Sequence, residues 1–228
     1  MGREIEIKLP LTDAEYQKIY SVISGDEKLP GVTICKHGDV PCPLEHIIKS
    51  DFYFSRYETR EESKAAGEPQ VIRIRCEEYE RIGTKDAAKK LGPKAFFCLK
   101  RKSIENGVEF NREDETFVEK PEVVRDLLLL SGYHQFFEKR KDAFSVYCDS
   151  EVLADCEFHL ELEKVNELKY IEVEVTDEKD SMLSADSVRI GLERFIELFG
   201  LDPSKRDSRS WMEILNKERK NKNAGGTL

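Results

Sequence analysis

Near the start of the chain, residues 3–9 have the sequence REIEIKL, in which charged and aliphatic side chains alternate strictly. Side chains two residues apart point to the same side of a β-strand. This period of two therefore predicts a strand over residues 4–9 with one charged face and one apolar face. The charged face carries Glu4, Glu6 and Lys8.

Pairs of like charges at positions i and i+2 recur along the chain, and each makes one side of its strand locally acidic or basic. The pairs are Arg73 and Arg75, Lys100 and Lys102, Glu113 and Glu115, Lys139 and Lys141, Glu161 and Glu163, and Glu172 and Glu174. A solvated face of an antiparallel sheet is also polar. Such a face usually mixes both signs, because like charges opposed across strands are destabilising. Wholly acidic and wholly basic strands instead favour a charged interior.

Periodicity and turn residues around these pairs predict eight strands, at 4–9, 46–55, 70–80, 95–103, 108–118, 136–148, 156–164 and 170–176. Asn106-Gly107 predicts a hairpin turn, since both residues tolerate positive φ. Helices are expected at 12–24, 121–130, 184–199 and 210–217. Long loops are expected at 25–44 and 57–69, where glycine, proline and polar residues gather.

The apolar faces of these strands need a covering, which the helices can supply. We therefore expect an α+β fold, a closed or nearly closed eight-stranded antiparallel β-barrel with a polar inner face and helices packed outside. An empty barrel of this kind would have a high folding free energy, because charged groups that are removed from water need partners. Bound cations and a polyanion would supply them. Without a low-complexity linker, residues 1–218 are expected to form a single domain and 219–228 a disordered tail.

Composition narrows the function. The formal net charge of -9 argues against DNA or RNA as the main partner, because binding to a phosphate backbone needs a basic field. No apolar run approaches the roughly 20 residues that span a membrane. The six cysteines follow no apolar leader, so we expect a cytoplasmic protein with reduced thiols.

Acidic and basic side chains in one interior suit metal-dependent phosphoryl transfer. Carboxylates are oxygen ligands for Mg²⁺ or Mn²⁺. Lysine and arginine bind phosphate oxygens, and arginine can do so with a bidentate fork. Phosphoryl transfer needs charge neutralisation, in-line positioning and an oriented nucleophile. A barrel interior with both residue classes could supply all three.

Taken in order, these motifs resemble the CYTH family, the triphosphate tunnel metalloenzymes, which include thiamine triphosphatases, inorganic triphosphatases and class IV adenylyl cyclases. Residues 4–8 are similar to the family's opening E-x-E-x-K signature. Further segments that carry the resemblance are 72–75, 98–102, 106–115, 139–141, 160–163, 170–174 and 208–211. The resemblance covers residues 3 to about 215. It implies the tunnel fold and a small-molecule triphosphate substrate, for a chain that is a monomer or a homodimer.

The resemblance also implies roles for individual residues. Those expected to bind the triphosphate are Lys8, Arg73, Arg75, Lys100, Lys102, Arg112, Lys139, Lys141 and Arg209. Those expected to hold Mg²⁺ or Mn²⁺ are Glu4, Glu6, Glu113, Glu115, Glu161, Glu163, Glu172 and Glu174. Glu4, Glu6 and Lys8 are the candidate catalytic residues, with Lys8 a candidate for proton transfer. Single histidines such as His159, and Trp211, are expected to be structural.

Two questions stay open at this point. In strand 108–118, Arg112 is out of phase with Glu113 and Glu115, so either that pair or Arg112 and Asp114 face inward. The main hypothesis is hydrolysis of a triphosphate such as tripolyphosphate, thiamine triphosphate or a nucleoside triphosphate. The alternatives are cyclisation of ATP to cyclic AMP, a non-catalytic polyphosphate-binding module, and a β-rich scaffold without a tunnel.

Overall fold

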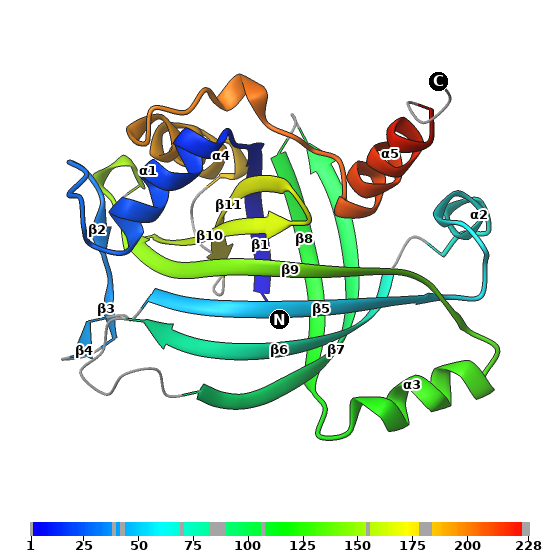
Figure 1. Ribbon diagram of the computed structural model, residues 1–228. Coiled ribbons are helices and arrows are strands. Elements are labelled where there is room, and N and C mark those ends of the chain that lie inside the picture. The colour runs from blue at the N-terminus through cyan, green and yellow to red at the C-terminus, as the bar shows by residue number, and fades with distance from the viewer. Residues whose placement is uncertain are drawn as a thin grey trace.

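The computed structural model describes residues 2–37, 40–41, 44–68, 71–82, 90–105, 108–153, 156–177 and 184–224. Its main feature is a nine-stranded antiparallel sheet with the order β10-β11-β1-β8-β7-β6-β5-β9-β2 (Figure 1). Strand β10 also pairs with β9, so eight strands close into a barrel and the short β2 extends one edge. The predicted α+β barrel is confirmed.

The barrel strands match the predicted strands closely. They are β1 (Gly2–Pro10), β5 (Leu44–Ser55), β6 (Val71–Ile82), β7 (Lys90–Glu105), β8 (Val108–Phe117), β9 (His134–Asp149), β10 (Glu157–Val165) and β11 (Leu168–Asp177). Three two-residue strands, β2 (Thr33–Ile34), β3 (Lys36–His37) and β4 (Val40–Pro41), lie in the segment predicted as a loop. The predicted Asn106-Gly107 turn lies outside the described residues.

The helices lie outside the barrel (Figure 1). They are α1 (Asp13–Ile23), α2 (Arg60–Ala65), α3 (Pro121–Leu130), α4 (Ala185–Leu198) and α5 (Trp211–Ala224), with 3₁₀ turns η1 (Glu151–Leu153) and η2 (Pro203–Lys205). Thr12 caps α1 through a reciprocal capping box with Glu15. None of these helices is both long and apolar enough to cross a membrane.

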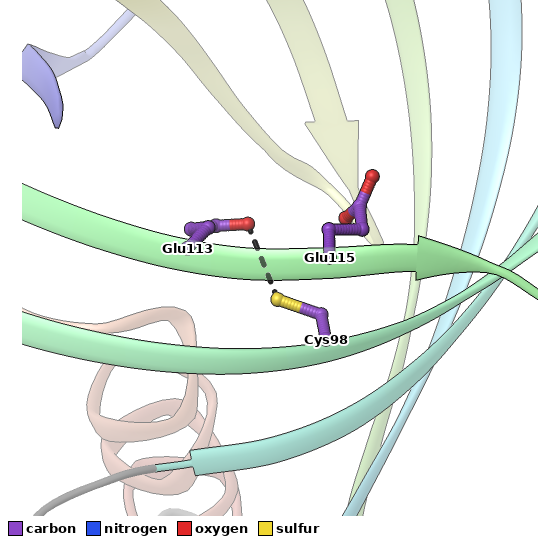
Figure 2. A group of neighbouring side chains, drawn as sticks. All are labelled: Cys98, Glu113 and Glu115. Carbon is purple, nitrogen blue, oxygen red and sulfur yellow. Dashed lines mark hydrogen bonds between the residues drawn. The ribbon is translucent and has the colours of Figure 1, made fainter. Parts of the chain in front are cut away.

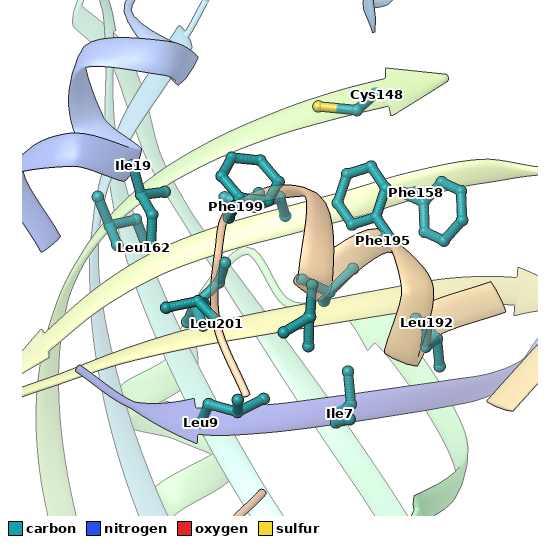
Figure 3. Packing of buried hydrophobic residues seen from close by; sticks show 14 of the residues in the cluster. Ile7, Leu9, Ile19, Cys148, Phe158, Leu162, Leu192, Phe195, Phe199 and Leu201 are labelled. Carbon is teal, nitrogen blue, oxygen red and sulfur yellow. The ribbon is translucent and has the colours of Figure 1, made fainter. Parts of the chain in front are cut away.

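The main hydrophobic core lies between the barrel wall and two helices. The outward faces of β1, β10 and β11 pack against α1 and α4. Phe158 of β10 stacks on Phe195 of α4 with ring centroids 4.2 Å apart, and Ile7 of β1 lies close by (Figure 3). Burial of these apolar side chains outside the barrel leaves the charged side chains of the same strands facing inward.

A second cluster anchors α5 near one end of the barrel. Trp211 packs edge-on against Tyr170 at 4.7 Å, and both are buried with Phe137 and Ile214. The expectation that Trp211 is a packing anchor is confirmed. We define this end of the barrel, where β1 finishes at Pro10, as the α5 end.

Two expectations about irregular segments are wrong. Residues 60–65, expected in a polar loop, form α2, because Thr59 and Glu62 make a second capping box. Helix α5 continues to Ala224, so residues 219–224 of the expected disordered tail are helical. Residues 225–228 lie outside the described part of the chain.

Candidate functional site

Strand order separates the two signs of charge inside the barrel. The strands β10, β11, β1 and β8 are neighbours and carry the glutamate pairs. On the other side, β7, β6 and β9 carry the lysine and arginine pairs, and β5, between β6 and β9, carries Lys49 and Asp51. We call these groups the acidic arc and the basic arc. Several ion pairs skip a strand, such as Arg73 of β6 with Glu113 of β8. Such contacts form across the concave inner face, which confirms that the paired charges point into the barrel.

The first acidic group joins Glu4 and Glu6 of β1 to Glu174 of β11. Each offers a carboxylate oxygen, and the three oxygens lie within 4.8 Å of one another. Glu6 accepts a hydrogen bond of 2.8 Å from Asn111 Nδ2. Within the described residues, no lysine or arginine makes an ion pair with Glu4 or Glu6. Three carboxylates therefore gather here without a lysine or arginine partner among the described residues, and Glu174 contacts His159.

This crowding changes the acidity of the first group. Burial, followed by the charges of Glu174 and Glu113, raises the pKa of Glu4 to about 7. Burial and the charge of Glu109 raise the pKa of Glu6 well above its ordinary value. Both shifts mean that the site opposes further negative charge. A bound cation would relieve that opposition.

The second acidic group contains Glu161, Glu163 and Glu172, whose carboxylate oxygens also lie within 4.8 Å. It differs from the first because Lys141 Nζ lies among them, 3.1 Å from Glu161 and 3.2 Å from Glu172 and in closer contact with Glu163. Lys49 also pairs with Glu161. The carboxylates of this group are therefore already paired with the ammonium groups of two lysines, Lys49 and Lys141.

Within the second group, the pKa values of two neighbouring carboxylates shift in opposite directions. Burial and the charge of Glu172 raise the pKa of Glu163 well above its ordinary value. Burial acts on Glu172 in the same direction, but the charges of Lys141, Lys8 and Lys139 and a hydrogen bond with Glu163 together hold the pKa of Glu172 well below its usual range. The buried Glu163 Oε2 meets no hydrogen-bond donor among the described residues.

The third group lies where the two arcs meet, between β7 and β8. Cys98, Glu113 and Glu115 lie close together there, and the Cys98 thiol donates to Glu113 at 3.4 Å (Figure 2). Arg73 pairs with Glu113 at 2.8 Å, and Lys100 pairs with it at the same distance. Burial would raise the pKa of Glu113, but Lys100 and Arg73 hold it well below its usual range.

The basic arc contains its own counter-charges, of which Asp51 of β5 is the most fully buried, and Glu77 of β6 lies 3.9 Å from Arg75. The Asp51 carboxylate accepts hydrogen bonds of 2.7 and 3.1 Å from Arg75 and lies 3.4 Å from Lys139 Nζ. Burial would raise the pKa of Asp51, but the charges of Arg75 and Lys139 lower it well below its ordinary value. Burial in turn lowers the pKa of Lys139 to about 8, despite Asp51.

Lys8 and Lys102 lie toward the α5 end. Lys8 Nζ donates to the Arg209 carbonyl at 2.7 Å and lies 3.9 Å from Glu172. Lys102 pairs with Glu109 and donates to the Ser208 carbonyl at 3.2 Å. The segment before α5 therefore contacts two lysines inside the barrel through its backbone.

Two predicted phosphate ligands do not join this interior. The Arg209 guanidinium forms hydrogen bonds of 2.8 and 2.6 Å with Asp207, and its side chain is 44% exposed. Arg112 lies on the outer face of β8, where its side chain is 55% exposed and 3.9 Å from Asp114. The register of β8 places Glu113 beside Lys100 and Asn111 beside Glu4, so Glu113 and Glu115 face inward and Arg112 faces outward.

The other predicted site residues all lie inside. The structure adds inward polar residues that sequence reasoning missed, namely Lys49, Asp51, Glu77, Glu109, Asn111, Ser145 and His159. Glu109 and Asn111 stand four and two residues before Glu113, and His159 stands two before Glu161. The same period-two rule would have found these three. Lys49 and Asp51 have opposite signs, so they form no like-charge pair.

The donor set fits a hard divalent cation best at the first acidic group. Mg²⁺ and Mn²⁺ prefer carboxylate oxygens. Glu4, Glu6 and Glu174 offer three of them without a direct lysine or arginine partner in the described chain, and two have a raised pKa. The basic arc opposite supplies donors for phosphate oxygens. Together these features place ligands for a metal ion and for a polyanion on facing walls of one barrel.

No protein-family model and no curated protein matches the chain. Solved structures do. A conserved hypothetical protein from Pyrococcus furiosus has 16% identity and a TM-score of 0.58, covering 92% of this chain and 98% of that chain. A proposed adenylate cyclase from Vibrio parahaemolyticus has 14% identity and a TM-score of 0.56, with 93% and 97% covered.

A third similar structure, from Hippeastrum, is described as a proposed adenylyl cyclase with a dominant triphosphatase activity. It has 16% identity and a TM-score of 0.56 and covers 96% of each chain. These chains share the triphosphate-tunnel fold of the CYTH family. The resemblance drawn from the sequence motifs is therefore confirmed at the level of the fold.

Proposed function

We propose that the chain is a divalent-metal-dependent triphosphatase of the CYTH type, which hydrolyses a triphosphate bound inside the barrel. The observation that carries this proposal is the division of the interior into an acidic arc and a basic arc. A triphosphate is a flexible polyanion whose oxygens can contact cationic side chains on one side and metal ions on the other. An interior that places these two wall types face to face suits that class of ligand.

The basic arc would bind the phosphates by exchange of partners. In the free protein its cations are paired with carboxylates, such as Arg73 and Lys100 with Glu113, and Arg75 with Asp51. Phosphate oxygens offer the same acceptor chemistry with more negative charge. The cations assigned to the triphosphate are Lys8, Arg73, Arg75, Lys100, Lys102, Lys139 and Lys141.

The first acidic group would hold a divalent ion through Glu4, Glu6 and Glu174. When bound, the ion would neutralise phosphate charge and favour ionisation of a water molecule. Glu161, Glu163 and Glu172 would balance Lys49 and Lys141 and could complete a further ion site once phosphate draws those lysines away. Glu113 and Glu115 would share the charge of Arg73 in the same way.

Lys8 would bind the phosphate nearest the α5 end. The Arg209 carbonyl and Glu172 hold its ammonium inside the barrel, 5.6 Å from the centre of the Trp211 ring. A cation fixed by neighbours on three sides needs little rearrangement to meet a developing negative charge. This is the role we assign to the lysine of the E-x-E-x-K motif.

Hydrolysis is preferred to ATP cyclisation. The similar Hippeastrum structure is described with a dominant triphosphatase activity although it is a proposed cyclase. Cyclisation would also need a pocket that orients the ribose hydroxyl toward the phosphate, and we identify none among the described residues.

One product assay tests the proposal. Purified protein is incubated with tripolyphosphate, thiamine triphosphate or ATP, each with Mg²⁺, Mn²⁺ or EDTA, and phosphate, pyrophosphate and cyclic AMP are quantified together. We expect phosphate release that needs the metal ion and yields no cyclic AMP. Cyclic AMP with pyrophosphate would show a cyclase instead. Binding without any product would show a polyphosphate-binding module.

A further inference from the structure

A chain of hydrogen bonds crosses three neighbouring strands of the barrel. His159 of β10 lies between Ser145 of β9 and Glu174 of β11. Its Nδ1 is 2.6 Å from Glu174 Oε1, and its Nε2 is 2.7 Å from Ser145 Oγ. Both ring nitrogens therefore have a partner.

The imidazole ring is also held on one face. Tyr147 of β9 stacks on it, with ring centroids 4.6 Å apart and an interplanar angle of 25°. An ionised carboxylate only accepts hydrogen bonds, so His159 Nδ1 must carry the proton that it shares with Glu174. The ring is therefore held in one orientation, and its Nδ1–H points at Glu174 Oε1. This hydrogen bond fixes the position of that carboxylate oxygen.

A serine, a histidine and an acid in this order also occur in nucleophilic triads. The surroundings of Ser145 argue against that use. Its register partners are Glu45 on β5 and Glu161 on β10, and His159 Nε2 is 3.9 Å from Glu161. A serine that attacks a phosphoryl or carbonyl group needs donors for the oxygen that becomes negative. Carboxylates at those positions would repel it.

The other end of the chain leads to the first acidic group. Glu174 contributes a carboxylate oxygen to the cluster with Glu4 and Glu6. Residues that hydrogen-bond a metal-ligating carboxylate orient it, and their loss typically weakens metal binding. His159 is the residue that stands in that relation to Glu174.

We propose that His159 is a positioning residue that orients Glu174 toward Glu4 and Glu6 for a divalent cation, with Ser145 and Tyr147 holding the ring. This inference rests on the metal site of the proposed function. It adds a residue outside the charged motifs and predicts that metal affinity depends on a hydrogen-bond donor that is not itself a metal ligand. His159 would not contact the triphosphate.

Three substitutions separate this role from a general structural one. His159→Asn keeps an amide donor near the position of Nδ1. His159→Phe keeps the ring that stacks on Tyr147 but removes both hydrogen bonds. His159→Gln places its amide near the position of Nε2, facing Ser145, and replaces the phenylalanine variant if that variant does not fold. His134→Phe is the matched control, because His134 lies at the start of β9, away from the acidic group.

Calorimetry with Mn²⁺ alone measures the effect without turnover. His159→Phe, or His159→Gln, is expected to weaken Mn²⁺ binding by about 10- to 100-fold. His159→Asn should restore most of the affinity, and His134→Phe should leave it unchanged. In turnover assays the Mn²⁺ concentration for half-maximal rate should rise in the phenylalanine variant, while kcat at saturating Mn²⁺ stays close to that of the unsubstituted protein.

The inference is overturned if the phenylalanine and glutamine variants bind Mn²⁺ as the unsubstituted protein does. It is equally overturned if the asparagine variant is as weak as the phenylalanine variant, or if a fluorophosphonate labels Ser145. Failure of the proposed function has a different signature. In that case no triphosphate is hydrolysed, yet Mn²⁺ affinity still separates the His159 variants.

Discussion

Asp51 and Arg75, on neighbouring strands, form a bidentate ion pair inside the barrel, with Asp51 Oδ1 2.7 Å from Arg75 Nε and Oδ2 3.1 Å from its Nη2. Asp51 is 0% exposed, and Lys139 approaches the same carboxylate. In the free protein this aspartate supplies the negative charge that a phosphate would supply in the complex. The relationship shows how a cationic wall remains stable without a ligand.

Replacing Asp51 by asparagine should therefore destabilise the free protein by about 3–5 kcal/mol, because two buried cations lose their counter-charge. Tripolyphosphate should restore stability, and its effect should be larger in Asp51→Asn than in the unsubstituted protein. Urea unfolding with and without tripolyphosphate measures both. Asp114→Asn, on the outer face of β8, is the control. Equal stabilisation of all three proteins would argue against a phosphate site at Arg75.

Arg73→Ala should weaken tripolyphosphate binding. Loss of a charged hydrogen bond costs about 1.5–3 kcal/mol, which corresponds to roughly a 10- to 100-fold rise in Kd. Arg112→Ala and Arg209→Ala should change Kd less than about twofold, because both guanidinium groups lie outside the interior. Titration calorimetry with tripolyphosphate compares the three variants. A loss in Arg112→Ala as large as that in Arg73→Ala would contradict the inward phase assigned to β8.

The two acidic groups should differ in metal affinity. Glu4→Gln removes a carboxylate from the group without an ammonium, whereas Glu161→Gln acts where Lys49 and Lys141 are already bound. We expect Glu4→Gln to weaken Mn²⁺ binding by more than about 100-fold, since it removes a ligand rather than a supporting contact. Glu161→Gln should have a smaller effect in the absence of substrate. A larger loss of Mn²⁺ binding in Glu161→Gln than in Glu4→Gln would instead place the metal ion in the second acidic group, beside Lys141.

Stability of the metal-free protein should fall as pH rises. Folding raises the pKa of Glu4 from 4.5 to about 7, so the folded chain holds a proton that the unfolded chain has released. This contribution is fully present below pH 4.5 and is lost as pH rises through about 7. A divalent cation binds the ionised carboxylate, so stabilisation by Mn²⁺ should grow over the same window.

Melting temperatures measured across this pH window, with EDTA or with Mn²⁺, test that expectation. Glu4→Gln is the matched control, because its difference from the unsubstituted protein isolates Glu4. The comparison is needed because His159 also titrates with a raised pKa. Burial lowers that pKa, but the charge and hydrogen bond of Glu174, with the charge of Glu161, together raise it, so His159 also lowers stability at higher pH. A stabilisation by Mn²⁺ that does not vary with pH would show that Glu4 is already ionised.

Much of the barrel was predictable because its inward residues come in like-charge pairs at i and i+2. That signal located seven barrel strands, including β1 and β10, and the Ile-, Phe- and Tyr-rich composition of residues 46–55 predicted the eighth, β5. The signal fails where signs alternate, so Lys49 and Asp51 of β5 were missed. In β8 both faces carry charges, and only its register with β7 and β1 places Arg112 outside. Register is a property of the assembled sheet rather than of one strand.

The grouping of the strands into an acidic arc and a basic arc could not be predicted from the sequence either. It depends on β1 pairing with β8 and β11, strands more than 100 residues along the chain. The acidic group of Glu4, Glu6 and Glu174 exists only because of that pairing. Likewise, the contact between His159 and Glu174 depends on the register of β10 with β11. Sequence reasoning could name these residues or their strands, but it could not bring them together.

The most direct test of the account is the anomalous scattering of Mn²⁺ in crystals soaked with a slowly hydrolysed triphosphate analogue. We expect a manganese peak between Glu4, Glu6 and Glu174, with phosphate density against Arg73, Arg75 and Lys100. A manganese peak elsewhere, or phosphate density confined to the outer surface, would contradict the assignment of the barrel interior as the active site.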